Sequence, residues 1–217
     1  MRLSITPEDA LIDVPRRIAL DGLAPGEQVE VASCTLRGAG VPWRAAARFV
    51  ADAEGTVDLW RDAPVAGSYQ GVSAMGLVWA QVPDTAGARE LFDAEPAAAL
   101  ATDILARRDG DARPVRGGFV QRLAAAGVTR REVREEGLVG TLFLPAGPGP
   151  HPAVMILNGS GGGINEPRAA LYASHGYAAF ALGYFKAPGL SDYISATRLE
   201  YFETALAWMH RTLKPLQ

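Results

Sequence analysis

Residues 151–185 read HPAVMILNGSGGGINEPRAALYASHGYAAFALGYF, and this stretch decides the fold of the second half of the chain. Ala153–Leu157 is a continuous apolar run, as expected of a strand that is buried on both faces. A glycine-rich turn, Asn158–Gly163, follows this strand, and Tyr177–Leu182 is a second apolar strand. With a helix between them, the two strands predict a βαβ unit in a parallel sheet.

The helix of this unit has start and stop signals in the sequence. Asn165 or Glu166 can cap its first turn, where Pro167 is well tolerated because that position needs no N–H. Gly176 is the expected end of the helix. The turn before the helix can present backbone N–H groups to a ligand. Two chemistries use such a turn, phosphate binding and stabilisation of an oxyanion.

Phosphate binding is the weaker of these two interpretations. A dinucleotide fingerprint, G-x-G-x-x-G, needs glycine at its sixth place, where this turn has Ile164. The fingerprint also needs an acidic residue at the end of the next strand, but residues 182–185 read LGYF. The turn also lacks the lysine that is followed by serine or threonine in a P-loop.

An oxyanion hole suits the turn better. In such a hole, backbone N–H groups stabilise the negative oxygen of a tetrahedral intermediate. Glycines favour this function because the substrate carbonyl must come close to bare backbone. The candidate oxyanion-hole residues are Ser160, Gly161 and Gly162.

Three separated motifs resemble those of one known family, in the same order along the chain. The first combines Ser68–Gly71 (SYQG) and Met75–Trp79 (MGLVW), the second is the glycine-rich stretch, and the third is Leu199–Glu203 (LEYFE). Together they resemble the acyl-CoA thioesterase / bile acid-CoA:amino acid N-acyltransferase family. The resemblance extends from about Ile12 to Met209.

This resemblance implies a mixed fold. It consists of an N-terminal, immunoglobulin-like β-sandwich over residues 1–126 and an incomplete α/β-hydrolase domain over residues 127–217. The implied enzyme is a thiolester hydrolase that converts acyl-CoA to fatty acid and coenzyme A through an acyl-enzyme. Acyl-CoA is its substrate, and no cofactor is implied. The alternatives are an acyl-CoA:amino acid N-acyltransferase and a truncated, non-catalytic module that binds acyl-CoA.

The catalytic groups of such an enzyme are not evident in the sequence. The family needs a nucleophile in a G-x-S-x-G-like elbow, a histidine that takes its proton and a carboxylate that orients the histidine. Ser160 does not lie in that pattern, so all three groups are expected after Gln217. His151, His175 and His210 are interpreted as structural, since none has a nucleophile and a carboxylate evidently placed around it. The chain alone is therefore expected to be inactive.

The N-terminal part is interpreted as short strands that glycine, proline and aspartate interrupt. The expected strands are Arg17–Leu20, Gln28–Leu36, Trp43–Val50, Thr56–Trp60, Gly76–Val82 and Glu95–Leu105. Trp43, Trp60 and Trp79 are expected to fill the sandwich core, since large aromatic residues dominate cores. Cys34 is expected to be a small buried hydrophobic residue.

Arg107–Gly118 is interpreted as a hairpin turn with an exposed connection. One interpretation of its four arginines is a patch that binds the phosphates of coenzyme A. The interleaved aspartates favour the other interpretation, a solvated loop.

Downstream, Arg130–Arg134 and Leu138–Leu144 are expected to form a hairpin, residues 186–198 an irregular loop and Leu199–Leu213 a helix. Apolar residues in that helix recur at spacings of three and four and predict one buried stripe. They are Leu199, Phe202, Leu206, Met209 and Leu213.

In α/β-hydrolases, the strand equivalent to Ala153–Leu157 lies between two other strands. Here only one of the two has an equivalent in the sequence. An apolar strand edge without a partner recruits another chain or aggregates. We therefore expect self-association through this edge.

Composition restricts the remaining function classes. At 217 residues, with 48% hydrophobic and 21% charged residues, the chain has the composition of a soluble globular protein. A net charge of −3 gives no reason to expect nucleic acid or an anionic membrane as a partner. The sequence shows no signal-peptide pattern, no apolar run of ~20 residues and no cluster with metal-ligand spacing. The single cysteine suits a reducing, cytoplasmic location.

Overall fold

The computed structural model describes residues 1–38, 40–87 and 98–213. The chain divides into two compact units, and the change from one to the other falls between Arg122 and Leu123. Each unit has its own sheets and its own buried clusters.

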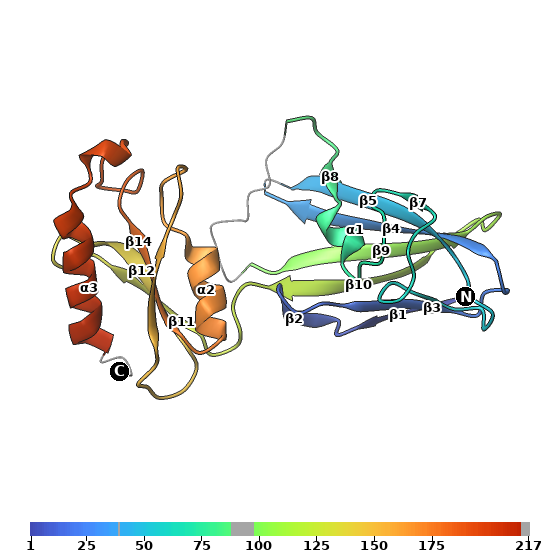
Figure 1. The fold of residues 1–217 in the computed structure, drawn as a ribbon, viewed down its shortest axis with the longest axis horizontal. Helices are drawn as coiled ribbons and strands as arrows, with labels where there is room; N and C mark the ends of the chain where they lie inside the picture. Colours follow the sequence, from blue (N-terminus) through green and yellow to red (C-terminus); the bar gives the residue numbers. More distant parts are fainter. Residues whose placement is uncertain (39, 88–97, 214–217) are drawn as a thin grey trace. The chain divides into compact units, whose positions relative to one another are not determined.

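The first unit is a β-sandwich (Figure 1). Its smaller sheet has the strand order β1-β3-β6, and its larger sheet has the order β2-β10-β9-β4-β5-β7, with β8 also paired to β5. All strand pairs are antiparallel except β2 with β10. The strands are β1 (Arg2–Thr6), β2 (Asp9–Leu11), β3 (Arg17–Asp21), β4 (Gln28–Arg37), β5 (Val41–Val50), β6 (Val57–Asp58), β7 (Ala66–Gly67), β8 (Val82–Pro83), β9 (Leu100–Arg108) and β10 (Val115–Arg122).

The long hairpin of β4 and β5 is the centre of the larger sheet, and its bounds were predictable from alternation. Val29 and Val31 face the core while Glu30 faces outward, as the alternating pattern predicts. One buried cluster fills the space between the two sheets. The smaller sheet contributes Ile5, Ile18, Leu20 and Val57, and the larger sheet contributes Val29, Val31, Phe49, Ile104 and Phe119.

Towards one end, the inward face of β4 becomes polar. Ser33 and Thr35 are buried there, and the amide nitrogen of Gln81 donates to both of their hydroxyl oxygens at 3.0 Å. The Thr35 hydroxyl also lies 2.7 Å from that of Thr102 on β9. Buried polar groups are stable when they are hydrogen-bonded, so this network closes the end of the sandwich without apolar filling.

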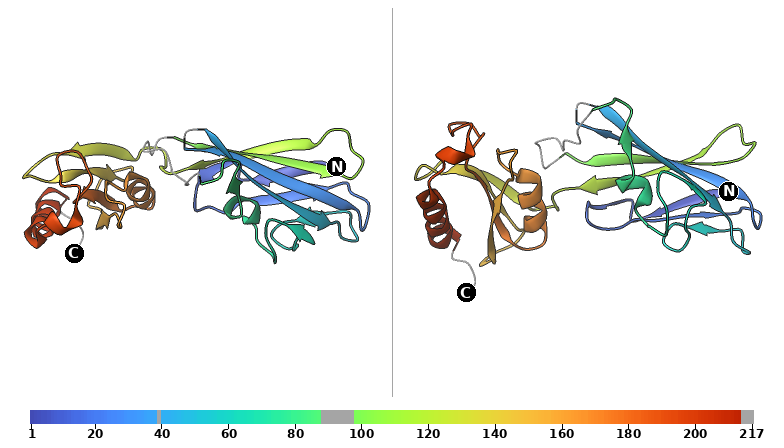
Figure 2. Two further views of the ribbon diagram at one scale, coloured as in Figure 1. Left: turned by 90° about the horizontal axis from the view of Figure 1, so that it is seen from above. Right: turned by 45° about the horizontal axis from the view of Figure 1, so that its top comes forward.

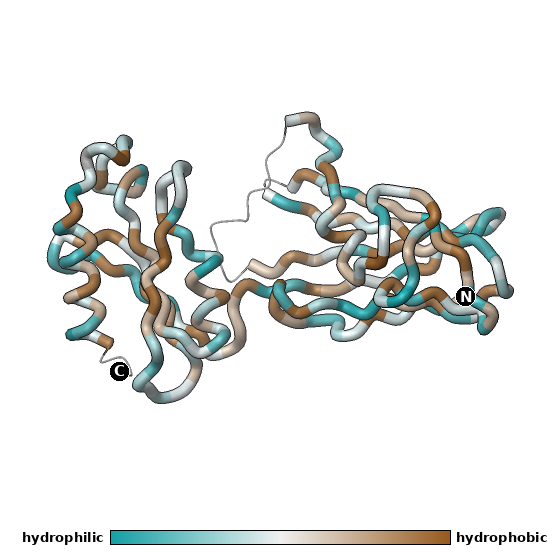
Figure 3. The backbone as a smooth tube through the Cα atoms, viewed as in Figure 1, coloured by the Kyte–Doolittle hydropathy of each residue, from teal (hydrophilic) through white to brown (hydrophobic). Residues whose placement is uncertain are grey.

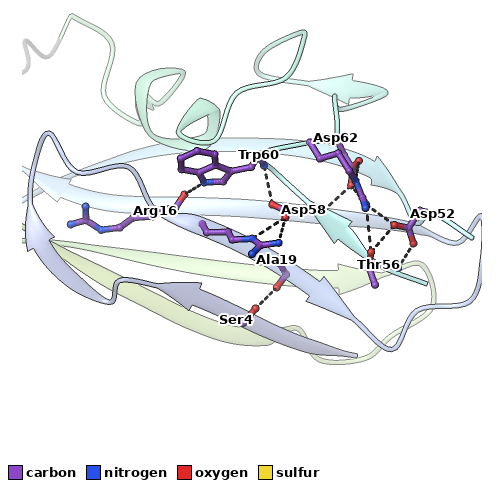
Figure 4. Close-up of polar contacts among 10 residues, drawn as sticks. Ser4, Arg16, Ala19, Asp52, Thr56, Asp58, Trp60 and Asp62 are labelled. Carbon is purple, nitrogen blue, oxygen red and sulfur yellow. Dashed lines mark hydrogen bonds and ion pairs between the residues drawn. The ribbon is translucent and has the colours of Figure 1, made fainter. Parts of the chain in front are cut away.

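The prediction that the tryptophans fill this core is wrong. Trp60 and Trp79 are 53% and 62% exposed, and Trp43 is half-buried. The indole N–H of Trp60 donates to the carbonyl of Arg16 at 2.9 Å (Figure 4), and that of Trp79 donates to the hydroxyl of Ser73 at 2.9 Å. A ring with one polar edge is well accommodated at the rim of a core, where its N–H finds a partner.

Asp58 organises the turn next to Trp60 (Figure 4). Its carboxylate accepts from the side chain of Arg17 at 2.7 Å and from the backbone N–H of Trp60 at 3.0 Å. The predicted strand Thr56–Trp60 therefore keeps only the two residues of β6, because the chain turns around this carboxylate.

The predicted strand Gly76–Val82 is also wrong. Gly76–Trp79 forms the short helix α1, and only Val82–Pro83 is a strand. The ring of buried Tyr69 lies against this helix, and a Cβ added at Gly76 would come within 2.3 Å of the ring carbons. Only glycine fits at this position. The close approach of the Tyr69 ring therefore explains why residue 76 is glycine.

The N-terminal strands β1 and β2 lie before the first strand that the sequence predicts. The fully buried side chain of Arg16 fixes the segment that joins them to β3. Its guanidinium donates to the carbonyls of Leu11 (3.2 Å), Val14, Ala10 (3.0 Å) and Val120 (2.7 Å). The contact with Val120 joins residues 104 positions apart, so no local pattern predicts it.

The second unit is a four-stranded sheet with the order β11-β12-β14-β13. The pair β13 and β14 is parallel and the other pairs are antiparallel, which confirms the predicted βαβ unit and the predicted hairpin. Its elements are β11 (Thr129–Val133), β12 (Val139–Leu144), β13 (Ala153–Leu157), α2 (Glu166–Ser174), β14 (Ala178–Gly183), the 3₁₀ helix η1 (Ile194–Ala196) and α3 (Leu199–Leu213).

Two helices cover opposite faces of this sheet (Figures 1 and 2). Successive residues of β14 alternate between them: Phe180 and Leu182 pack in the cluster that contains α3, and Ala179 and Ala181 pack in the cluster that contains α2. All six residues of β14 are buried, and the central strands are strongly hydrophobic in Figure 3. No helix among the described residues is long and apolar enough to cross a membrane.

β13 differs from the prediction of a strand that is buried on both faces. Ala153, Val154 and Met155 are half-buried, and Leu157 is 41% exposed. The reason is its position, because β13 is the last strand in the sheet order and pairs only with β14 among the described residues.

The bounds of α3 agree with the prediction, and its buried stripe agrees in part. Leu199 and Leu206 are 81% and 59% exposed, whereas Ala205 and Trp208 are buried. The Trp208 ring lies 4.9 Å from the ring of Phe180, measured between centroids. Met209 of the predicted stripe is buried in the same cluster, and Phe202 and Leu213 pack against it. The buried face is therefore shifted towards Ala205 and Trp208, and Leu199 and Leu206 remain at the surface.

Two smaller predictions concern the larger sheet of the sandwich. Cys34 lies in β4, as predicted, but it is half-buried because its neighbours on the strand are the residues that face inward. In the hairpin of β9 and β10, Arg108 pairs with Asp111 at 2.9 Å, and Arg107 lies 3.7 Å from Glu30. These ion pairs agree with a solvated turn. The start of the predicted strand Glu95–Leu105 lies outside the described residues, and its later part is β9.

Candidate functional site

The loops at the carboxyl ends of β13 and β14 form the candidate site. Because these strands are parallel, both loops leave the same edge of the sheet, where ligands of open α/β sheets bind. The loop after β13 comprises residues 158–165 and is called the glycine loop below. The backbone N–H of Gly163 in this loop donates to the carbonyl of Phe185 in the second loop at 2.8 Å, so the two loops are in contact.

Asn158 holds the glycine loop in shape. Its side-chain oxygen accepts from the backbone N–H of Gly159 at 3.1 Å, and its side-chain nitrogen donates to the carbonyl of Gly162. The hydroxyl of Tyr184 donates to the backbone carbonyl of Asn158 at 2.6 Å. Asn165 caps α2 by accepting from a backbone N–H of its first turn, as predicted. The loop is therefore braced from both of its ends.

The three candidate oxyanion residues are not equivalent. The backbone N–H of Gly162 already donates to the carbonyl of Gly159 at 3.0 Å, and Gly162 is buried with φ +68°. A Cβ at Gly162 would lie 2.7 Å from the Cβ of Lys186, so this glycine shapes the turn.

Ser160 and Gly161 remain open to a ligand. Both residues are exposed, and their backbone N–H groups donate to no acceptor in the described part of the chain. A Cβ at Gly161 would have no heavy atom within 4 Å. The loop thus offers two adjacent N–H donors with free space in front of them.

A surface hollow of about 360 Å³ lies beside Tyr184. The Tyr184 ring packs against Phe202 of α3 at 5.4 Å between centroids, and the Tyr184 carbonyl accepts from the hydroxyl of Thr197 at 2.7 Å. The lining residues are Tyr184, Leu190, Ser191, Thr197, Arg198, Glu200, Tyr201 and Thr204. Tyr184 connects this lining to the glycine loop, because its hydroxyl donates to the carbonyl of Asn158.

The described residues do not assemble a nucleophile–base pair at this site. The side chain of Ser160 is exposed and makes no hydrogen bond within the described part of the chain. His175 is exposed at the carboxyl end of α2, His210 is exposed on α3, and His151 is half-buried before β13. Within the same residues, no group of three or more His, Cys, Asp or Glu side chains is placed to hold a metal ion.

Comparison with known proteins now decides the family. The family described as the acyl-CoA thioester hydrolase/BAAT N-terminal region matches residues 13–135, more than half of the chain. The chain belongs to this family. Acyl-coenzyme A thioesterase 6 of Mus musculus is 41% identical over 202 residues, which cover 92% of this chain. The predicted resemblance is thereby confirmed.

The chain spans about half the length of the curated relatives it matches. The aligned part covers 48% of the mouse thioesterase 6. The peroxisomal succinyl-coenzyme A thioesterase of Mus musculus is 37% identical over 202 residues (92% of this chain, 48% of the relative). Acyl-coenzyme A thioesterase 1 of Homo sapiens is 36% identical over 200 residues (91% and 48%).

Two motifs of this thioesterase-family chain have structural functions. In LEYFE, the Tyr201 hydroxyl accepts from the backbone N–H of Val139 at 3.0 Å and donates to the carbonyl of Gly183 at 2.8 Å, while both glutamates are exposed. This hydroxyl therefore ties α3 to β12 and β14. In SYQG, the Ser68 hydroxyl accepts from the backbone N–H of Ala46 at 3.0 Å. The glycine loop is the motif that remains for chemistry.

Sequence reasoning missed two residues of the site, Tyr184 and Lys186. The brace from Tyr184 to Asn158 joins residues 26 positions apart, so no local pattern predicts it. Lys186 could have been singled out from the sequence, because lysine is rare in this chain, which has 19 arginines and only two lysines.

Proposed function

We propose that this chain supplies the oxyanion side of an acyl-CoA thioester hydrolase site, built on an incomplete α/β-hydrolase sheet of β11 to β14. The observation that carries this proposal is the pair of unengaged N–H donors at Ser160 and Gly161, at the carboxyl end of β13. Membership of the thioester hydrolase family supports the same substrate class, an acyl-CoA.

The chemistry follows from the positions of these donors. As a nucleophile attacks the thioester carbonyl, its oxygen becomes negative, and the N–H groups of Ser160 and Gly161 bind it more tightly than the neutral carbonyl. One such donor contributes roughly 3–4 kcal/mol to the transition state. Ser160 acts through its backbone and is not the nucleophile. The nucleophile, histidine and carboxylate of the reaction lie beyond Gln217 in this proposal, so the chain by itself lacks turnover.

Two alternatives have an observation in their favour. An N-acyltransferase would pass the acyl group to an amine. The description of the matching family names BAAT beside the acyl-CoA thioester hydrolases, which supports this alternative. A module that binds acyl-CoA without turnover agrees with the lack of a nucleophile–histidine contact among the described residues. A cytoplasmic location stays a prediction, since some relatives are named as peroxisomal or mitochondrial.

The coding DNA after Gln217 discriminates between these alternatives. An in-frame continuation with a G-x-S-x-G elbow and later Asp and His residues would favour the enzyme. A stop codon would favour the module.

The direct test joins the chain either to that continuation or to the C-terminal half of the mouse thioesterase 6. Release of coenzyme A thiol from palmitoyl-CoA is then measured. We expect turnover, and we expect Gly161→Trp to lower kcat about 100-fold or more, because the indole fills the space in front of the donors. The matched control is Ser160→Ala, which keeps the backbone N–H and should change kcat less than about threefold. A folded, extended protein whose turnover is unaffected by Gly161→Trp would refute the oxyanion assignment.

A further inference from the structure

Lys186 has an unusual backbone for a residue with a side chain. Its φ is +48°, in the left-handed region that favours glycine. Among the described residues, only Glu136 shares this property without being glycine. Glu136 has a structural explanation, because Glu136 and Gly137 (φ +76°) are the central residues of a tight turn, in which the N–H of Leu138 donates to the carbonyl of Glu135 at 2.8 Å. The Glu136 carboxylate also accepts two hydrogen bonds from Arg211, whereas Lys186 makes no ion pair with any described residue.

The backbone on both sides of Lys186 is fixed. The carbonyl of Phe185 accepts from Gly163 of the glycine loop at 2.8 Å, and the N–H of Lys186 donates to the carbonyl of Ser191 at 2.8 Å. The Cβ of Lys186 lies against Gly162, where an added Cβ would be 2.7 Å away. The surrounding contacts thus hold a strained position directly beside the candidate oxyanion donors. Strain of this kind accumulates at functional sites.

The side chain of Lys186 is available to a ligand. The residue is exposed, and its ammonium lies 5.9 Å from the centroid of the Phe185 ring, the only charge-related contact that it makes within the described residues. Elsewhere in this chain, cations are almost always arginines, and many of them pair with carboxylates. A lysine ammonium is a compact point charge that binds phosphate or carboxylate oxygens without a fixed geometry.

We propose that Lys186 binds an anionic oxygen group of the substrate while the N–H groups of Ser160 and Gly161 bind the thioester carbonyl. The proposal rests on the proposed function, since it places a second contact in the same site. Two parts of an acyl-CoA can supply the anion. These are the phosphates of the coenzyme and the terminal carboxylate of a dicarboxylic acyl chain. Lys186 is a positioning residue in either case.

The test measures equilibrium binding by calorimetry with the full chain, so that it does not depend on turnover. Four probes separate the two sources of the anion. Coenzyme A and palmitoyl-CoA carry phosphates, S-succinyl-pantetheine carries only a carboxylate, and S-palmitoyl-pantetheine carries neither. Lys186→Asn removes the charge with a residue that tolerates the left-handed region. Lys186→Arg keeps the charge. Arg211→Gln, near the carboxyl end of α3, is the control with the same change in net charge.

We expect Lys186→Asn to weaken binding of the anion-bearing probe about tenfold or more and to reduce the salt dependence of its Kd. Lys186→Arg should restore binding to within about threefold, and Arg211→Gln should leave it unchanged. Weaker binding of coenzyme A and palmitoyl-CoA assigns the phosphates, and weaker binding of S-succinyl-pantetheine alone assigns the carboxylate. Binding of S-palmitoyl-pantetheine should not change.

The outcomes that overturn the proposal differ from those that overturn the proposed function. If Gly161→Trp abolishes thioester binding while Lys186→Asn binds all four probes normally, Lys186 has no part in the site and the oxyanion loop stands. If Lys186→Asn weakens binding but Gly161→Trp does not, the anion site stands and the oxyanion loop fails. A wild-type chain that binds no probe more tightly than about 1 mM overturns both.

Discussion

The edge strands of the sandwich and of the four-stranded sheet differ in length and in charge. The larger sheet of the sandwich ends in β2 and β7, which have three and two residues, and such short edges do not template another strand. In the second unit, β11 (TRREV) carries charged side chains at one edge, whereas β13 (AVMIL) leaves an apolar edge at the other. Among the described residues, the larger sheet of the sandwich therefore ends in short edges, and the second unit leaves the β13 edge unpaired on the side of the glycine loop.

This difference separates the sandwich from the unit that carries the candidate site. The sandwich joins two sheets around one cluster and closes its polar end with buried hydrogen bonds. The second unit places unengaged N–H donors and a strained lysine next to its open edge. Functional residues on loops that a rigid sheet supports are the common arrangement in α/β proteins.

A core substitution in the sandwich should have the largest effect and should show that the two units are separate. Phe49→Ala removes a fully buried ring and should lower the free energy of unfolding of the sandwich by about 3–5 kcal/mol. The neighbour Val50 is 38% exposed, and Val50→Ala should change the free energy of unfolding of the sandwich by less than about 1 kcal/mol. Scanning calorimetry should show the sandwich transition moving while that of the second unit stays. A shift of both transitions together would contradict the prediction that the two units unfold separately.

Removing the Tyr201 hydroxyl should destabilise only the second unit. Tyr201→Phe loses the hydrogen bonds to Val139 and Gly183, which leaves part-buried backbone groups of the sheet without partners. The expected loss is about 1–3 kcal/mol in the free energy of unfolding, measured by urea denaturation. An unchanged midpoint would mean that water replaces the hydroxyl at no cost.

The open edge should make the chain self-associate. We expect a sedimentation coefficient that rises with protein concentration, because β13 can pair with a strand of a second copy. Leu157→Lys adds a charge at the exposed end of β13 and should weaken association about tenfold, or 1.4 kcal/mol. Thr129→Lys on the charged edge β11 is the matched control and should have no effect. A monomer at all concentrations would show that the edge is covered.

Tyr69 provides the smallest effect and a contrast with Tyr201. The Tyr69 hydroxyl is buried and has no hydrogen-bond partner among the described residues, so Tyr69→Phe should not lower stability at neutral pH and should raise it by up to about 1 kcal/mol.

The burial of the Tyr69 hydroxyl affects stability at high pH. Burial raises the pKa of Tyr69 to about 12, above the value of about 10 for an unfolded tyrosine. The folded state favours the neutral phenol, so its contribution to stability is present below pH 10 and is lost as the pH rises towards 12. Wild type should therefore lose more stability than Tyr69→Phe in this range, as measured by urea denaturation at each pH. Parallel losses would contradict the assignment.

Local signals predicted the second unit well. The cap at Asn165, the stop at Gly176 and the apolar run of β13 each act within a few residues, and the structure places these elements where they indicate. The alternation of β4 is equally local. The buried face of α3 was predicted only in part, because the spacing included the exposed Leu199 and Leu206 and omitted Trp208, which contacts Phe180.

The features that the sequence could not predict depend on contacts between residues far apart in the chain. Trp60 is exposed because its N–H reaches the carbonyl of Arg16, which is 44 residues away. In the site, the glycine pattern predicted the loop but not which donors are available. Gly162 donates within its own turn and packs against Lys186, whereas the N–H groups of Ser160 and Gly161 have no acceptor among the described residues.

The most direct test of the central claim is release of coenzyme A thiol from palmitoyl-CoA by the chain of residues 1–217, against a blank without protein. The chain offers oxyanion donors but no attacking group among its described residues, so we predict no release above the blank. The claim would be contradicted by turnover that survives repurification and is lost in Gly161→Trp, because the chain would then contain a complete active site.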